Sequence, residues 1–128
     1  MGHTYAELRL SNAAKPHLDV LVERALVDTG AAQLCISRRV AQQLDLEEVY
    51  QREVTFADGR RETVPYVGPI RCEFGNRGCM LGAFVIGEDT PTLMGALPME
   101  DMDLVVSPLD GKVEPNPRAP NIPSAIVA

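Results

Sequence analysis

The sequence is poor in the residues that build several common kinds of site. It has three cysteines, Cys35, Cys72 and Cys79, none of them in a Cys-x-x-Cys pair, and two histidines, His3 and His17. This odd, widely spaced set of cysteines argues against a disulfide framework or a zinc knot. Two isolated histidines leave almost no material for a zinc site or a His-based catalytic triad. We therefore expect no metal and no cofactor.

Positive charge and long apolar runs are also scarce. Twelve Lys and Arg stand against 18 Asp and Glu, which gives a net charge of −6 and no basic footprint for nucleic acid or anionic lipid. No apolar stretch approaches the roughly 20 residues that a membrane helix needs. The N-terminal residues 1–4 lack the charged start and the apolar run of a signal peptide, so we expect a cytoplasmic protein.

What is present indicates a small globular domain built mostly from strands. The chain has 128 residues, of which 45% are hydrophobic, enough for one domain with its own core. Alternating apolar residues predict a strand over Thr4–Leu10, and the Val- and Leu-rich run Leu18–Val27 predicts one or two more. Ser37 is a good N-cap, so a short helix is expected from Arg38 to about Leu44.

From Glu48 onward the helical period disappears and turn signals recur. Pairs of apolar runs flank turns that contain glycine, a pattern typical of hairpins, and Thr92–Gly95 reads as a short strand. Pro98 suits the first position of a second short helix, roughly Met99–Met102. The predicted fold class is thus all-β with two short helices. The expected hairpins are Val49–Ala57 with Glu62–Val67, Ile70–Phe74 with Met80–Ile86, and Leu104–Ser107 with Lys112–Glu114.

The composition changes after Glu114. Four prolines fall between Pro115 and Pro123, and such a segment cannot maintain a sheet ladder. We expect a folded domain over residues 1–114 and an extended or disordered Pro-rich tail over residues 115–128.

The sharpest chemical feature is Asp28-Thr29-Gly30-Ala31, which follows an apolar strand. Alone, the triplet is equally typical of an Asx turn at a strand end. Its context is more informative, because two further features follow it in order. A hairpin with the tip Ala57-Asp58-Gly59-Arg60 comes about thirty residues later, and the segment Leu93-Met94-Gly95 lies well downstream, directly before a short helix.

This ordered set resembles the retropepsin-like family of single-domain aspartic proteases over roughly residues 4–114. The resemblance implies a closed, single-lobe β-barrel and hydrolysis of peptide bonds. It implies that Asp28 is the catalytic acid and that Thr29, Gly30 and Ala31 support its loop. It also implies that Ala57, Asp58, Gly59 and Arg60 belong to a flap over the substrate, and that Leu93, Met94 and Gly95 form the strand beside the catalytic loop.

Two departures from the retroviral pattern stand out. Ala32 and Ala96 occupy the positions of an aspartate and an arginine that pair in retroviral members, and because both are missing no buried charge is left alone. The flap tip Asp58-Gly59-Arg60 is charged rather than apolar and glycine-rich. Substrate contacts and dimer geometry therefore do not carry over from the retroviral enzymes.

The mechanism of this family requires two carboxyl groups that share one proton, and the chain has one candidate loop. We therefore expect a homodimer in which each copy contributes Asp28 on a two-fold axis, acting on an extended peptide. Nothing in the sequence recommends pairing Asp28 with Glu23, Asp45 or Asp89 of the same chain. The alternative is a catalytically weak or inactive module of the same fold that dimerises or binds peptides.

Other features are weaker candidates. The acidic groups Glu88–Asp89 and Glu100–Asp103 could bind a divalent cation, but solvated charges explain them better because no Asp-x-Asp-x-Asp-Gly loop is formed. The apolar segment Ile122–Val127 could occupy the cleft of its own or a neighbouring dimer. A disordered terminus explains it better.

Overall fold

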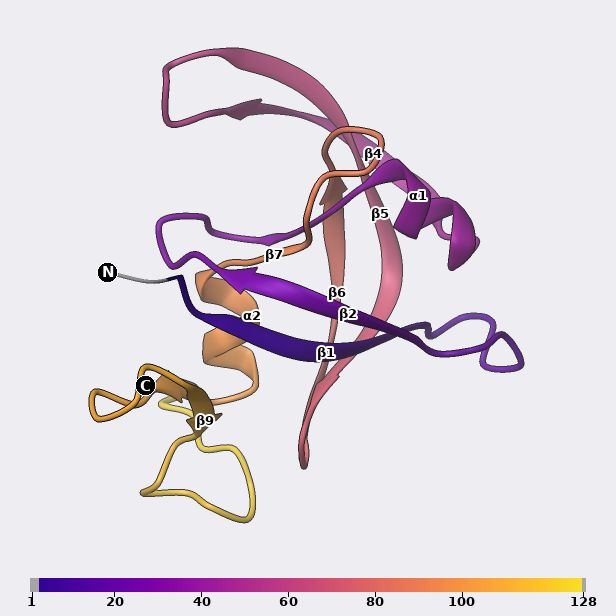
Figure 1. Ribbon diagram of the computed structural model, residues 1–128. Helices are drawn as coiled ribbons and strands as arrows, with labels where there is room; N and C mark the ends of the chain where they lie inside the picture. The colour runs from indigo at the N-terminus through magenta and orange to yellow at the C-terminus, as the bar shows by residue number, and fades with distance from the viewer. Residues whose placement is uncertain (1–2, 128) are drawn as a thin grey trace.

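The computed structural model describes residues 3–127, which form strands and two short helices (Figure 1). The helices are α1 (Arg38–Gln43) and α2 (Ala96–Asp101). The strands are β1 (Tyr5–Asn12), β2 (Leu21–Val27), β3 (Leu34–Ile36), β4 (Glu47–Thr55), β5 (Arg61–Phe74), β6 (Arg77–Val85), β7 (Leu93–Met94), β8 (Leu104–Val106) and β9 (Val113–Pro115).

Six of these strands close into a barrel. The main sheet has the order β1-β2-β7-β3-β6-β5-β4, and β1 also pairs with β5, which closes the ring. Strand β4 lies outside the ring and pairs with β5, so that the β4–β5 hairpin projects from the barrel (Figure 1). Strands β8 and β9 form a separate two-stranded sheet. The predicted fold class, an all-β single-lobe barrel with two short helices, is confirmed.

The barrel interior is filled by side chains from the inward faces of its strands. Strand β1 shows the predicted alternation, since Ala6, Leu8 and Leu10 are buried while Glu7 is exposed. Leu34 of β3 and Met94 of β7 are completely buried from other sides of the ring. A small barrel packed in this way has no room for a ligand inside, so any binding site must lie on its surface.

Both helices exist, but only the first begins where the sequence predicts. Ser37 caps α1, as its Oγ accepts a hydrogen bond from the Val40 amide at 3.2 Å. Helix α2 begins at Ala96 with Gly95 as its N-cap, so the predicted start at Pro98 is wrong by two residues. Pro98 lies inside the first turn, where its missing N–H is not needed for the helix.

Strand β5 is a single strand of 14 residues, whereas the sequence pattern suggested two strands separated near Gly68-Pro69. The register of β5 against β6 shifts between Val67 and Ile70. A bulge of this kind bends a strand without ending it. As a result, the first half of β5 pairs with β4 and the second half pairs with β1.

The segment after β9 is held against the barrel. Asp103 accepts hydrogen bonds from the Asn116 side chain at 3.1 Å and from the Ser124 amide at 2.9 Å. The buried Arg77 donates to the carbonyl of Ala119. The β8–β9 ladder ends with Leu104 opposite Pro115, one residue beyond the expected end of the folded part. No helix within residues 3–127 is long and apolar enough to cross a membrane.

Candidate functional site

Asp28 directly follows β2, a strand held from both sides. Strand β1 pairs with β2 antiparallel, and β7 pairs with it parallel, with Val27 opposite Met94. The Asp28 amide donates to the Met94 carbonyl at 3.0 Å and so extends this pairing by one bond. The apolar strand therefore delivers the aspartate to a fixed position at the rim of the barrel.

The backbone turns sharply after Asp28 and orients its carboxylate. Asp28 Oδ1 accepts a hydrogen bond from the Gly30 amide at 3.0 Å, and the Asp28 carbonyl accepts one from the Ala31 amide at 3.0 Å. This is the Asx turn that the bare triplet suggests. A Cβ on Gly30 would stand 3.1 Å from Asp28 Oδ1, so a larger residue would crowd the carboxylate. The Asp28 side chain is exposed, and its other oxygen has no hydrogen-bond partner within the part of the chain described.

Helix α2 locks this loop from behind. The amides of Gly95, Ala96 and Leu97, at the start of the helix, donate to the carbonyls of Gln33, Ala31 and Ala32 at 3.0, 2.8 and 2.9 Å. Helix N-termini have amides without partners inside the helix, and here the loop supplies their acceptors. A Cβ on Gly95 would lie 2.5 Å from the Gln33 carbonyl oxygen and 2.6 Å from that of Ala31. Only glycine allows this approach.

A cleft of about 650 Å³ opens in front of Asp28. Its floor is the loop of residues 28–33, and its roof is the end of β4 together with the residues that follow it, 52–57. The wall between them is mostly apolar. The wall residues are Cys35, Phe84, Ile86 and Leu93. Segments far apart in the sequence thus enclose one groove with a carboxylate at its base.

The predicted site residues separate into two groups. Asp28, Gly30, Ala31, Ala57 and Leu93 all line the cleft. The others do not line it, for reasons that differ: Met94 and Gly95 are buried behind the loop, whereas Thr29 is exposed at its tip. The hairpin tip residues Asp58, Gly59 and Arg60 are exposed beyond the cleft.

The arm of the hairpin, rather than its tip, contributes most of the roof. The family resemblance placed the flap over this hairpin and singled out its tip, where Asp58-Gly59 is a turn signal. The tip itself is a tight turn: Asp58 Oδ1 accepts from the Arg60 amide at 3.0 Å, and Gly59 has φ of 86°. The Arg60 guanidinium lies 4.5 Å from the centre of the Phe56 ring, a cation–π contact.

Cys35 is the one thiol in the cleft. Burial and, as a smaller effect, the nearby negative charge of Asp28 together raise its pKa to about 11. Both effects disfavour the thiolate. Cys35 is therefore a neutral, apolar part of the wall at neutral pH rather than a nucleophile.

Three acids that could have paired with Asp28 within the chain are bound elsewhere. Glu23 accepts a hydrogen bond from the buried Thr92 hydroxyl at 3.0 Å, while Asp45 pairs with Lys15 and Asp89 with Arg39. None of the three lines the cleft.

One acid that the sequence did not single out does line it. Glu53, in the roof, has its carboxylate 3.8 Å from the guanidinium of Arg61. It is the only carboxylate besides Asp28 among the residues lining the cleft.

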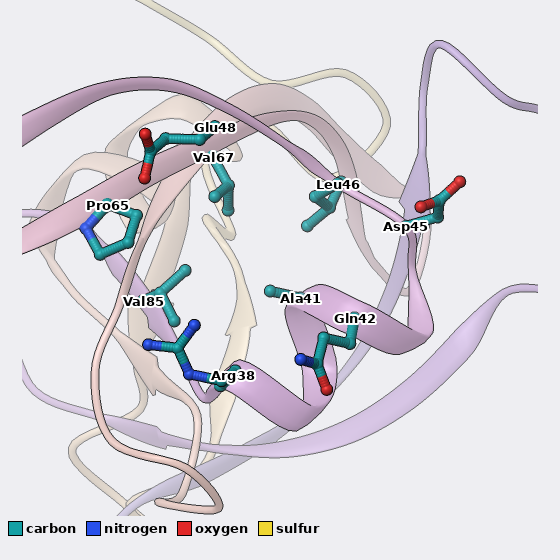
Figure 2. Close-up of a pocket in the computed structure, with 9 residues that line it drawn as sticks. All are labelled: Arg38, Ala41, Gln42, Asp45, Leu46, Glu48, Pro65, Val67 and Val85. Carbon is teal, nitrogen blue, oxygen red and sulfur yellow. The ribbon is translucent and has the colours of Figure 1, made fainter.

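A second hollow, of about 300 Å³, lies at α1 and is separate from the cleft (Figure 2). Its inner side chains are apolar, among them Ala41, Val67 and Val85. Figure 2 shows the Asp45 carboxylate directed away from them, consistent with its pairing to Lys15. Arg38, Gln42 and Glu48 also line the hollow, and Asp28 is not part of it.

Metal ligands do not converge at either place. Within residues 3–127, no three His, Cys, Asp or Glu side chains are grouped closely enough to hold a metal ion. The chemistry that this arrangement offers is that of an exposed, oriented carboxylate beside an apolar groove.

A closed barrel with an Asp-Thr-Gly loop held by a glycine at the start of a short helix defines the single-lobe, retropepsin-like class of acid-protease fold. The family model for aspartyl proteases matches residues 18–114, most of the chain, and the chain therefore belongs to this family. At the family level it is a peptidase. No curated protein matches the sequence.

Proposed function

We propose that the protein is a homodimeric aspartic endopeptidase, in which Asp28 of two identical chains forms one active site. The observation that supports this most strongly is the Asp28 carboxylate, oriented by the Gly30 amide and exposed at the base of the cleft. One exposed carboxylate is half of the machinery that peptide hydrolysis by this chemistry requires. A two-fold axis beside Asp28 supplies the other half from an identical chain.

The reaction would run through a water held between the two carboxyl groups. At about 3 Å separation the pair shares one proton. The ionised carboxylate takes a proton from water as the water oxygen attacks the scissile carbonyl carbon, and the protonated one donates a hydrogen bond to the carbonyl oxygen. When the tetrahedral intermediate collapses, the C–N bond breaks and the amine nitrogen receives a proton from the pair. Activity should lie on the acid side, where the singly protonated pair is populated.

The rest of the loop would serve the dimer. Thr29 is exposed next to Asp28, and its hydroxyl has no hydrogen-bond partner in the described part of the chain. We propose that the two Thr29 hydroxyls lock the two loops together. Gly30 allows the backbone of each loop to approach its twin.

The β4–β5 hairpin would act as a flap. It pairs with the barrel only through β5 and overhangs the cleft, with Arg52–Ala57 facing the site. Closing over an extended peptide, it would exclude water and order the substrate as an added strand. The apolar wall of Cys35, Phe84 and Leu93 favours apolar side chains beside the scissile bond.

The proposal is tested by comparing peptide cleavage by the native protein, Asp28→Asn and Glu53→Gln from about pH 4 to about pH 7. Asp28→Asn should abolish turnover and Glu53→Gln should retain it, since Glu53 faces Arg61 rather than a twin acid. Equal cleavage by native protein and Asp28→Asn would contradict the proposal and favour the alternative, a peptide-binding module of the same fold. Loss of turnover in Glu53→Gln alone would point to an acid pair within one chain.

A further inference from the structure

A third hollow, of about 350 Å³, lies between β6 and α2. It meets the cleft at Gln33, which lines both. Gln33 ends the loop that begins at Asp28, so the hollow lies at the far end of the cleft floor from the loop's exposed tip. A peptide longer than the cleft would reach this hollow where it passes Gln33.

One face of β6 runs from the cleft to this hollow. Phe84 lines the cleft and Met80 lines the hollow, and both point to the same side of the strand because side chains alternate. At about 3.3 Å per residue they are roughly 13 Å apart. Between them lies Gly82, whose amide donates to the Tyr66 hydroxyl at 3.2 Å. The Tyr66 ring meets the Phe84 ring edge-on at 5.3 Å and also lines the hollow, so an aromatic and apolar surface continues from one to the other.

The hollow combines exposed apolar side chains with acids that have no cationic partner. Met80 is 57% exposed and Leu97 is 47% exposed, high values for large apolar residues. Leu81 also lines the hollow, as do Glu100 and Asp101 in the last turn of α2, and neither acid forms an ion pair within residues 3–127. The C-terminal end of a helix favours positive charge, yet α2 has no basic residue in its last turn. No cationic side chain within residues 3–127 therefore neutralises the acids of this hollow.

We infer that this hollow is an outer subsite for a Lys or Arg side chain of the substrate. The aliphatic stem would lie over Met80, Leu97 and Tyr66, and the cationic end would reach Glu100 and Asp101. A long basic side chain fits both the apolar residues and the acidic residues of this hollow. The inference rests on the proposed function, and it defines the substrate class as peptides with apolar residues in the cleft and a basic residue further along.

The test uses binding rather than cleavage, so it does not depend on turnover. Random synthetic peptides of about twelve residues, roughly 40 Å when extended, are bound to the full-length Asp28→Asn protein, and the bound peptides are sequenced. We expect enrichment of Lys and Arg at one fixed distance from an apolar pair. Affinity for a selected peptide should fall about fivefold in Glu100→Gln/Asp101→Asn, the size expected for partly exposed ion pairs. The charge reversal Glu100→Lys/Asp101→Lys should shift the enrichment to Asp and Glu.

Matched controls separate the subsite from general charge attraction. Asp19→Asn/Glu47→Gln removes two exposed acids outside the cleft and the hollow, and it should leave binding unchanged. Enrichment without Lys or Arg, equal loss in this control, unchanged affinity in Glu100→Gln/Asp101→Asn, or no peptide binding would each overturn the inference. Absence of turnover in the native protein, with charge-dependent binding intact, would instead overturn the proposed function and leave the subsite standing.

Discussion

A Cβ on residue 95 would stand 2.5 Å from the carbonyl oxygen of Gln33, well inside normal contact distance. The amide of Gly95 donates to this same oxygen at 3.0 Å. Helix α2 and the Asp28 loop are therefore in direct backbone contact, and the glycine is what permits it. These backbone contacts hold the loop in place. The position of Asp28 therefore depends on helix α2, which is distant in the sequence.

Gly95→Ala should thus damage the site and the fold together. We expect the free energy of unfolding to fall by about 1–3 kcal/mol, because backbone atoms cannot yield as side chains can. Urea unfolding measures this loss, and peptide cleavage should fall with it. Gly78→Ala is the matched control, since a Cβ there would meet the Glu73 side chain at an ordinary 3.5 Å. Equal stability of the two variants would contradict the close approach.

The Cys35 thiol gives a prediction about pH. Its pKa is about 11 in the folded protein against an ordinary value of 9.0, mainly through burial and then through Asp28. Above pH 9 the unfolded chain loses this proton first, so stability is complete below about pH 9 and falls as pH rises towards 11. The loss should reach about 2–3 kcal/mol at most.

Unfolding of native protein and Cys35→Ala at a series of alkaline pH values tests this directly. Between about pH 9 and pH 11, the free energy of unfolding of the native protein should fall relative to that of Cys35→Ala. A difference that stays constant over this range would show that the Cys35 thiol is not held neutral by its surroundings.

The tail is the subject of a third prediction. Removing residues 116–128 deletes the bonds from Asn116 and Ser124 to Asp103, and it uncovers Arg77. We expect stability to fall by about 1–3 kcal/mol, the range for a few hydrogen bonds and an exposed core edge. Removing residues 125–128 should have no effect, because Ile126 and Val127 are 96% and 95% exposed. Equal effects of the two deletions would contradict the docking of residues 116–124.

A separate prediction concerns the buried side chain of Arg77. Its guanidinium is buried, yet Nε and Nη1 have no hydrogen-bond partner within residues 3–127. A buried charge that is only partly satisfied often stabilises less than an apolar side chain of similar size. Arg77→Met should therefore be neutral or stabilising in thermal unfolding. A large loss of stability would show that the charge is compensated in a way the tail contact does not explain.

How far the sequence could predict this molecule depends on how local each feature is. The Ser37 cap and the Asp58-Gly59 and Gly75-Asn76 turns are set by neighbouring residues, and they were predicted correctly. Strand β3 was missed, because Leu34–Ile36 are three residues, all buried, and show no alternation. The start of α2 was misplaced because Gly95 caps it through acceptors that come from a loop sixty residues earlier.

The same contrast between local and long-range features applies to the residues of the site. The Asp28 motif is visible in the sequence, as is the Leu93-Met94-Gly95 segment that packs beside it. Cys35, Phe84 and Ile86 were not predicted to face Asp28, because β3 and β6 come together only through parallel pairing across fifty residues. Arg52 and Glu53 were missed for the same reason, since their role follows from where β4 lies over the loop.

The most direct test of the account is a subunit-mixing experiment. A fixed amount of native protein is equilibrated with increasing amounts of Asp28→Asn, and peptide cleavage is measured. If each site needs Asp28 from two chains, an equal amount of Asp28→Asn lowers activity to about half, and a tenfold excess lowers it to about a tenth. Activity that stays constant as Asp28→Asn is added, although the chains exchange, would show that one chain suffices and would contradict the shared site.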